Sequence, residues 1–277
     1  MTYKLICDSC TDLPQEILSD VHVEKIPLSL QIGGETIPDD DSIAQDVLLD
    51  KIRQCKEALH TACPSPAQYM DAFDMEGDNY VVTLSANLSG SHNAATQAAS
   101  IYREEGGTGN VHVFNSRSAS AGQVLVALKI RELAEAGTPF DQVVEKIETF
   151  IGRMQTLFVL DNLDTLRKNG RMTKVQSLVS GAFRVKLLMG GTREGEIEKL
   201  GQGLSMKQTL VRMASRMAED ADHEGRTLVV AQCNCPERAE EFCALVRERC
   251  KFKDIVVVPA GGVSTLYAND GGIITAY

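Results

Sequence analysis

Apolar runs of strand length alternate with segments of helical period through the first half of the chain. The runs at Lys4–Cys7, Tyr80–Leu84 and Val111–Phe114 are short and flanked by turn-forming residues, as buried parallel strands are. Apolar residues recur with the period of a helix at Ile43–Cys55, Ala67–Phe73, Ala94–Glu104 and Gly122–Ala136. Strands that alternate with helices predict a parallel sheet with helices on both faces.

The pattern changes after one more helical segment, Phe140–Met154. Strand-like runs then follow at Leu157–Leu160, Lys186–Met189, Glu196–Lys199, Thr227–Gln232, Ile255–Pro259 and Ile273–Tyr277. A second α/β unit is the simplest account of this change. We therefore predict a two-domain α/β fold, with an N-terminal parallel-sheet domain at residues 1–155 and a smaller C-terminal α/β domain at residues 156–277.

Composition and charge exclude several classes of function. The formal net charge of −10 over 277 residues argues against nucleic acid, because phosphate contacts need clustered Lys and Arg. No run approaches the roughly eighteen apolar residues that span a bilayer. The N-terminus leads directly into a predicted strand and lacks the regions of a secretory signal, so we expect a cytoplasmic protein. The eight cysteines lack the spacing of a zinc site, and no metal or organic cofactor is expected.

The common catalytic motifs are absent from the sequence. It contains no phosphate-binding Gly-rich loop, no HExxH and no GxSxG elbow, which argues against an enzyme. Hydroxyl-rich segments stand instead where predicted strands give way to helices. In a parallel sheet these positions share one edge, where the N-termini of helices favour anions.

Two of these segments hold candidate ligands for a carboxylate. Thr61 is expected in a loop just before a helix capped by Ser65, and Ser89 and Ser91 flank Gly90 at the start of another helix. The alternative is that these hydroxyls only cap their own helices, which such residues commonly do. His92 stands beside Ser91, and a capping or solvent-facing role is expected for it rather than that of a base.

A third segment, NSRSASAGQ at 115–123, also follows a predicted strand, and its Ser118 could line the same crevice. A basic cluster adds Arg167, Lys168, Arg171 and Lys174 to an otherwise acidic chain. It could dock an acidic partner or a phosphate, or it could be a solvated turn.

Taken together, these segments resemble the DegV family, whose carrier members bring fatty acids to a bacterial fatty-acid kinase. The likeness begins with CDSCTDLP at 7–14 and IPLSLQIGGETIP at 26–38. It continues through TACPSP, LSGSHNAA, NSRSASAGQ and LDNLDTLRKNGRMTK in the family's order. It implies that the chain buries a long-chain fatty acid, holds the carboxylate through Thr61 and Ser89, and presents it to a kinase. Arg167 and Arg171 of the basic cluster are the candidates for docking a partner.

Two departures from the family pattern bear on function. Tyr267 stands where the family usually carries a His, and a tyrosine can donate to a carboxylate but carries no positive charge at neutral pH. Leu204 lies in the segment that replaces the basic stretch associated with kinase docking. The alternatives are therefore a carrier of another lipid or small carboxylate without a kinase, and an enzyme with Ser89 or Ser91 as nucleophile.

Overall fold

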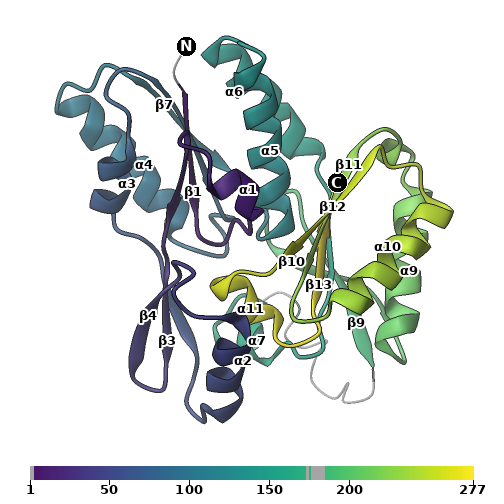
Figure 1. The fold of residues 1–277 in the computed structure, drawn as a ribbon. Coiled ribbons are helices and arrows are strands. Elements are labelled where there is room, and N and C mark those ends of the chain that lie inside the picture. Colours follow the sequence, from purple (N-terminus) through teal and green to yellow (C-terminus); the bar gives the residue numbers. More distant parts are fainter. Residues whose placement is uncertain (1–2, 173–174, 176–184) are drawn as a thin grey trace.

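The computed structural model describes residues 3–172, 175 and 185–277, which form two large sheets and a small one (Figure 1). The first sheet has the order β2-β1-β6-β7 and is parallel throughout. Its strands are β1 (Tyr3–Asp8), β2 (Val23–Ile26), β6 (Asp78–Thr83) and β7 (Asn110–Asn115). Because the pairing is parallel, the carboxyl ends of all four strands lie at one edge of the sheet.

Helices cover both faces of this sheet, as the sequence predicts. The helices that pack against this sheet are α1 (Gln15–Leu18), α3 (Pro66–Ala72), α4 (Ser91–Glu104), α5 (Ala121–Glu135) and α6 (Phe140–Arg153). Ile6 and Val81 point toward α3 and α4, whereas their neighbours Leu5 and Val82 point toward α5 and α6. This alternation follows from the two-residue period of a strand.

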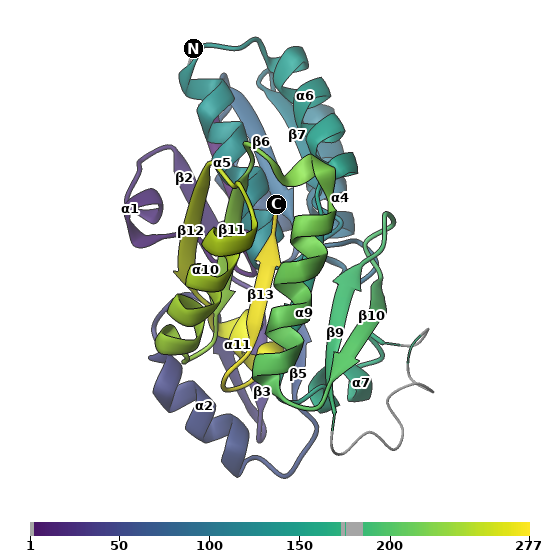
Figure 2. The same cartoon turned by 90° about the vertical axis from the view of Figure 1, so that its right-hand side faces the viewer.

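The second sheet has the order β10-β9-β8-β13-β11-β12 and is mixed, with β11 and β12 parallel to each other and the other pairs antiparallel. Its strands are β8 (Thr156–Val159), β9 (Lys186–Gly191), β10 (Ile197–Gly203), β11 (Thr227–Gln232), β12 (Asp254–Pro259) and β13 (Ile273–Ala276). Helices α9 (Met206–Glu219) and α10 (Pro236–Arg249) cover one face, as Figure 2 shows. Among the described residues of this half, the short helical elements are α7 (Asp164–Lys168), η2 (Ala221–His223) and α11 (Gly262–Ala268).

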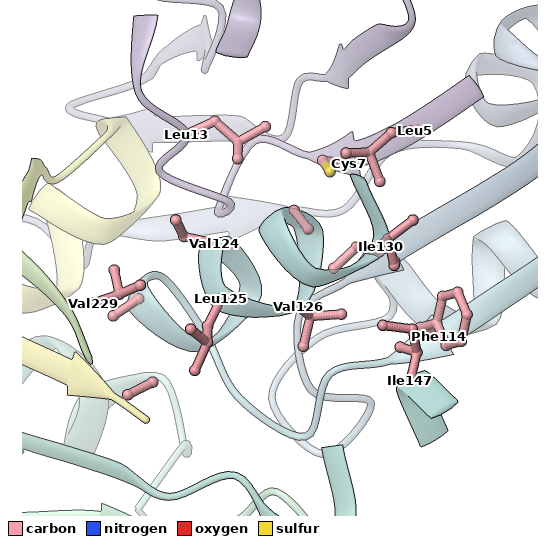
Figure 3. Packing of buried hydrophobic residues seen from close by; sticks show 14 of the residues in the cluster. Leu5, Cys7, Leu13, Phe114, Val124, Leu125, Val126, Ile130, Ile147 and Val229 are labelled. Atoms are coloured by element: carbon pink, nitrogen blue, oxygen red, sulfur yellow. The ribbon is translucent and has the colours of Figure 1, made fainter. Parts of the chain in front are cut away.

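Helix α5 lies between the two large sheets. Residues 121–127 are buried without interruption, which is the pattern of a helix that has no solvent face. Val124 and Leu125 share one core with Leu5 and Cys7 of the first sheet and Val229 of the second (Figure 3). The two halves of the chain therefore share a hydrophobic core.

A small antiparallel sheet, β4-β3-β5, was not predicted. It consists of β3 (Ser29–Ile32), β4 (Glu35–Pro38) and β5 (His60–Ala62), with α2 (Gln45–Gln54) following β4 in the chain. Gly33 and Gly34 turn the chain between β3 and β4 at φ of 56° and 80°. The expectation that Thr61 lies in a loop is wrong, because it pairs with Leu30 across β5 and β3.

The described strands divide between the halves without mixing. The first and third sheets draw their strands from before Gln155, and the second sheet draws all six from after it. The division into residues 1–155 and 156–277 nevertheless remains a prediction, because α5 packs against both large sheets. Within the described part of the chain, no helix is long and apolar enough to cross a membrane.

Candidate functional site

A cavity of about 110 Å³ lies where the carboxyl ends of β1, β6 and β7 face the second sheet and α11. Apolar side chains from both halves line it, among them Leu28, Leu88, Phe158, Leu166, Ile197 and Ile274. This is the edge at which a doubly wound sheet forms its ligand crevice. An apolar lining of this kind favours a hydrocarbon group over a polar solute.

Four of the predicted ligands line this cavity, and three of them are Thr61, Ser89 and Tyr267. Thr61 on β5 and Tyr267 on α11 are half-buried, and their hydroxyl oxygens lie 3.0 Å apart in a hydrogen bond. Ser89 also lines the cavity, and its hydroxyl accepts the backbone N–H of Ser91 at 3.2 Å. The site thus combines an apolar wall with a few hydroxyl groups, although Thr61 and Tyr267 are 206 residues apart in sequence.

Arg171 also belongs to the cavity lining, although the sequence analysis assigns it to a docking surface. Its Nε donates to the backbone oxygen of Leu88 at 3.1 Å, and its Nη1 donates to that of Asn169. Arg167 does not line the cavity and forms an ion pair with Asp164 at 3.2 Å. Lys174 lies outside the described residues. Arg171 therefore brings a guanidinium group to the cavity wall.

Ser91 and Gly90 stand apart from the cavity lining. The Ser91 side chain is completely buried, donates to the Asp8 carboxylate at 2.7 Å and lies 2.6 Å from the Tyr69 hydroxyl. Gly90 precedes α4, and a Cβ placed on it would lie 3.1 Å from the Cys63 sulfur. The Ser91 hydroxyl is thus engaged in internal contacts and does not face the cavity.

Ser118 lines another part of the cavity, where its hydroxyl lies 2.7 Å from that of Thr156. Gly195, at the turn between β9 and β10, closes over this region. Its backbone oxygen accepts the Ser85 hydroxyl at 2.7 Å, and Asn87 donates to the backbone oxygen of Glu194, also at 2.7 Å. The hairpin therefore joins the second sheet to the loop after β6.

Asp12 lies one layer behind the cavity wall and was missed by the sequence analysis. It is only 5% exposed, and it accepts hydrogen bonds from Ser120 at 2.5 Å, from the Gly261 N–H at 2.8 Å and from Ser264 at 3.0 Å. Burial raises the pKa of Asp12 to about 7, although these three donors oppose the shift. Ser120 and Ser264 both line the cavity.

Comparison with known proteins identifies the family of the chain. The family model described as "Uncharacterised protein, DegV family" matches residues 2–276. The chain belongs to the DegV family. A DegV domain-containing protein from Streptococcus gordonii is 31% identical over 279 residues, which cover all of this chain and 99% of that protein.

Solved structures of DegV proteins share this two-domain α/β fold. A DegV family protein from Ruminococcus gnavus, refined with vaccenic acid, is 45% identical, with full coverage of both chains and a TM-score of 0.96. The Streptococcus pneumoniae fatty acid kinase (Fak) B3 protein, loaded with linoleic acid, is 31% identical, covers 100% of this chain and 99% of its own, and has a TM-score of 0.91.

Among residues 3–172, 175 and 185–277, no three His, Cys, Asp or Glu side chains are grouped in a way that could hold a metal ion. His92 is half-buried, and its Nδ1 lies 3.3 Å from the Thr83 hydroxyl. Burial lowers the pKa of His92. The Ser91 hydroxyl contacts Asp8 and Tyr69 while His92 faces Thr83, so these two neighbours in sequence do not form a nucleophile and base pair.

Proposed function

We propose that this protein is a cytosolic carrier that buries the tail of a long-chain fatty acid in the cavity and presents the carboxylate to a partner kinase. The observation that carries the proposal is the cavity itself, in which an apolar wall ends at the hydroxyls of Thr61, Ser89 and Tyr267. The fatty acids in the R. gnavus and S. pneumoniae relatives support the ligand class. The kinase named for the S. pneumoniae protein supports the partner.

Burial of the tail would dominate the affinity. Each buried methylene is worth about 0.8 kcal/mol, so a tail of roughly fifteen carbons contributes about 10 kcal/mol before the costs of binding. The carboxylate loses water on entry, and hydrogen bonds must replace that water. Thr61, Ser89 and Tyr267 supply donors, and Arg171 adds a nearby positive charge. These groups act as ligands, and the proposal assigns no catalytic step to them.

The first test is extraction of the protein, purified from a heterologous host, with organic solvent, followed by mass spectrometry. We expect about one fatty acid per chain. A Thr61→Ala, Ser89→Ala double variant should retain less than about a tenth as much, because it loses two hydrogen bonds to a charged group. Uptake of added oleic acid, measured on both proteins, gives the same comparison under controlled loading.

The matched control is the double variant Thr96→Ala, Ser100→Ala. It also removes one Thr and one Ser hydroxyl, but both residues are exposed on α4 and do not line the cavity. The control should bind as the parent protein does. A parent protein that carries no lipid and takes up no added fatty acid would refute the proposal.

A carrier that serves no kinase is the second candidate, and Leu204 favours it. This side chain is 77% exposed just before α9, in the segment where the resemblance implies a basic docking stretch. Incubation of the loaded protein with ATP and the S. pneumoniae fatty-acid kinase separates the two candidates. Acyl phosphate formed at a rate comparable to that with Fak B3 supports the kinase partner, and its absence alongside an active Fak B3 control supports the second candidate.

An enzyme that uses the same crevice is the remaining alternative. It requires turnover of an acyl ester or thioester, and that turnover should be lost in a Ser89→Ala variant that still binds lipid. We expect no turnover of either substrate by the parent protein or by Ser89→Ala.

A further inference from the structure

Helix α11 carries Tyr267, yet side chains from the first half of the chain hold its N-terminal end. The backbone N–H groups of Gly262 and Val263 donate to the buried Asp39 carboxylate at 2.9 and 3.1 Å. Gln45 donates to the backbone oxygen of Ala260 at 2.8 Å and to the Thr265 hydroxyl at 3.0 Å. The position of Tyr267 therefore depends on contacts made across the two halves.

Asp12, like Asp39 and Gln45, contacts the start of α11, but it also contacts the start of α5. One carboxylate oxygen accepts Gly261 and Ser264 at the start of α11, and the other accepts Ser120 at the start of α5. Ser120 has φ of 52° and ψ of −116°, a backbone conformation that costs a residue with a Cβ about 1–3 kcal/mol. Such a conformation persists only where its surroundings enforce it.

We propose that Asp12 is a positioning residue for the ligand: its ionised carboxylate holds the starts of α5 and α11 together, keeps Tyr267 against Thr61 and so tightens retention of the bound acid. The ligand part of this inference rests on the proposed function. Asp12 does not line the cavity and acts through Ser120 and Ser264, which do.

Protonation of Asp12 weakens this hold without abolishing it. A carboxylic acid can still accept from Gly261 and donate to Ser120, but its hydrogen bonds lose the charge assistance that makes those of a carboxylate about twice as strong. Burial raises the pKa of Asp12 to about 7, so the change falls near neutral pH. Asparagine offers the same acceptor and donor as the protonated acid, and Asp12→Asn should behave at every pH as the parent does in acid.

The titratable and charged groups around Asp12 come from several elements. Asp39 and Asp41 from the loop after β4 and Lys25 from β2 line a second cavity together with Asp12. The thiols of Cys10 and Cys233 also sense the charge of Asp12, and burial raises the pKa of both. Asp41 forms an ion pair with Lys25, whereas Asp39 accepts the hydrogen bonds from α11, so Asp41→Asn is a control that removes the same charge nearby.

The decisive measurement is the dissociation constant of oleic acid between about pH 6 and about pH 8. In the parent protein and in Asp41→Asn, we expect binding to weaken about tenfold as the pH falls. Asp12→Asn should bind oleic acid with the weaker dissociation constant at every pH. Its only remaining pH dependence should come from ionisation of the ligand's own carboxyl group. Parent affinity and a parent pH profile in Asp12→Asn would overturn the inference.

A second measurement does not need the ligand. Hydrogen exchange of the amides at 261–268, corrected for intrinsic rates, reports how firmly α11 is held in the free protein. Protection there should be several-fold lower in Asp12→Asn than in the parent at about pH 8, while protection in α9 is unchanged. Equal protection in α11 would overturn the positioning role. If the parent binds no fatty acid, the proposed function fails, and the exchange data still decide whether Asp12 holds α11.

Discussion

Ser120 is a single residue whose hydrogen bonds offset a strained backbone conformation. Its hydroxyl donates to the buried Asp12, and its backbone donates to the oxygen of Cys10 at 3.1 Å. Those contacts hold a positive φ in a residue that carries a Cβ. Its backbone strain and its hydrogen bond can be separated, because glycine adopts this conformation without penalty and alanine does not.

We therefore expect Ser120→Ala to be less stable than Ser120→Gly by about 1 kcal/mol. Both variants lose the hydroxyl, but only alanine keeps the strain. Urea unfolding at a fixed pH measures the difference in the free energy of unfolding. If the glycine variant were the less stable of the two, the strain assigned to Ser120 would be wrong.

Part of the cavity lining could be predicted from the sequence at this scale. Thr61, Ser89, Ser118 and Tyr267, named from hydroxyl-rich segments and family resemblance, all line one cavity. The position of Asp12 could not be predicted, because its partners Ser120 and Ser264 are 108 and 252 residues away. Contacts over such separations leave no local pattern in the sequence. The N-cap of α3 does leave one, because Ser65 is followed directly by Pro66, and the predicted cap is confirmed.

At the scale of elements, period and length decided what could be predicted. The alternating strands and helices of the first half have strong local patterns, and the parallel sheet with helices on both faces is confirmed. Strands β3, β4 and β5 are only three or four residues long and have exposed positions, which is too little for a period to emerge. The missed sheet is the one that carries Thr61.

The β9–β10 hairpin gives a prediction at this scale. Gly195 has φ of 83°, and a Cβ there would lie 2.7 Å from the Arg117 Cα and closer still to the Ser85 hydroxyl. Gly195→Ala should therefore cost more than backbone strain alone, by about 1–3 kcal/mol, and should weaken lipid binding because the hairpin lines the cavity.

Gly137→Ala is the matched control, because its φ is 71° and a Cβ there meets nothing within 4 Å. It should lose about 1 kcal/mol and bind lipid normally. Thermal unfolding and oleic acid binding, measured on both variants, test the pair. Equal losses in the two would show that the hairpin is not packed tightly against Arg117.

At the scale of the whole molecule, buried carboxylates make stability depend on pH. Global unfolding returns Asp12 to water, and burial raises its pKa in the folded state to about 7, so its contribution to the free energy of global unfolding is fully present below about pH 4 and is lost as the pH rises through about 7. Release of α11 alone instead breaks the hydrogen bonds from Gly261 and Ser264, which lower the pKa of Asp12, so that this local hold is stronger when Asp12 is ionised. Asp12→Asn removes this dependence. Its free energy of unfolding relative to the parent should rise by a few kcal/mol between about pH 4 and about pH 8, as urea titrations can show. A constant difference would contradict the raised pKa.

Helix α5 has a further consequence for the molecule. By sequence it belongs to the first half, yet Val124 and Leu125 share a core with Val229 and Ala276 of the second sheet. A chain cut after residue 155 would keep the helix but uncover the side chains that the second sheet buries. A protein fragment that ends at this boundary would therefore expose an apolar surface on α5 and tend to aggregate, whereas the full chain buries that surface.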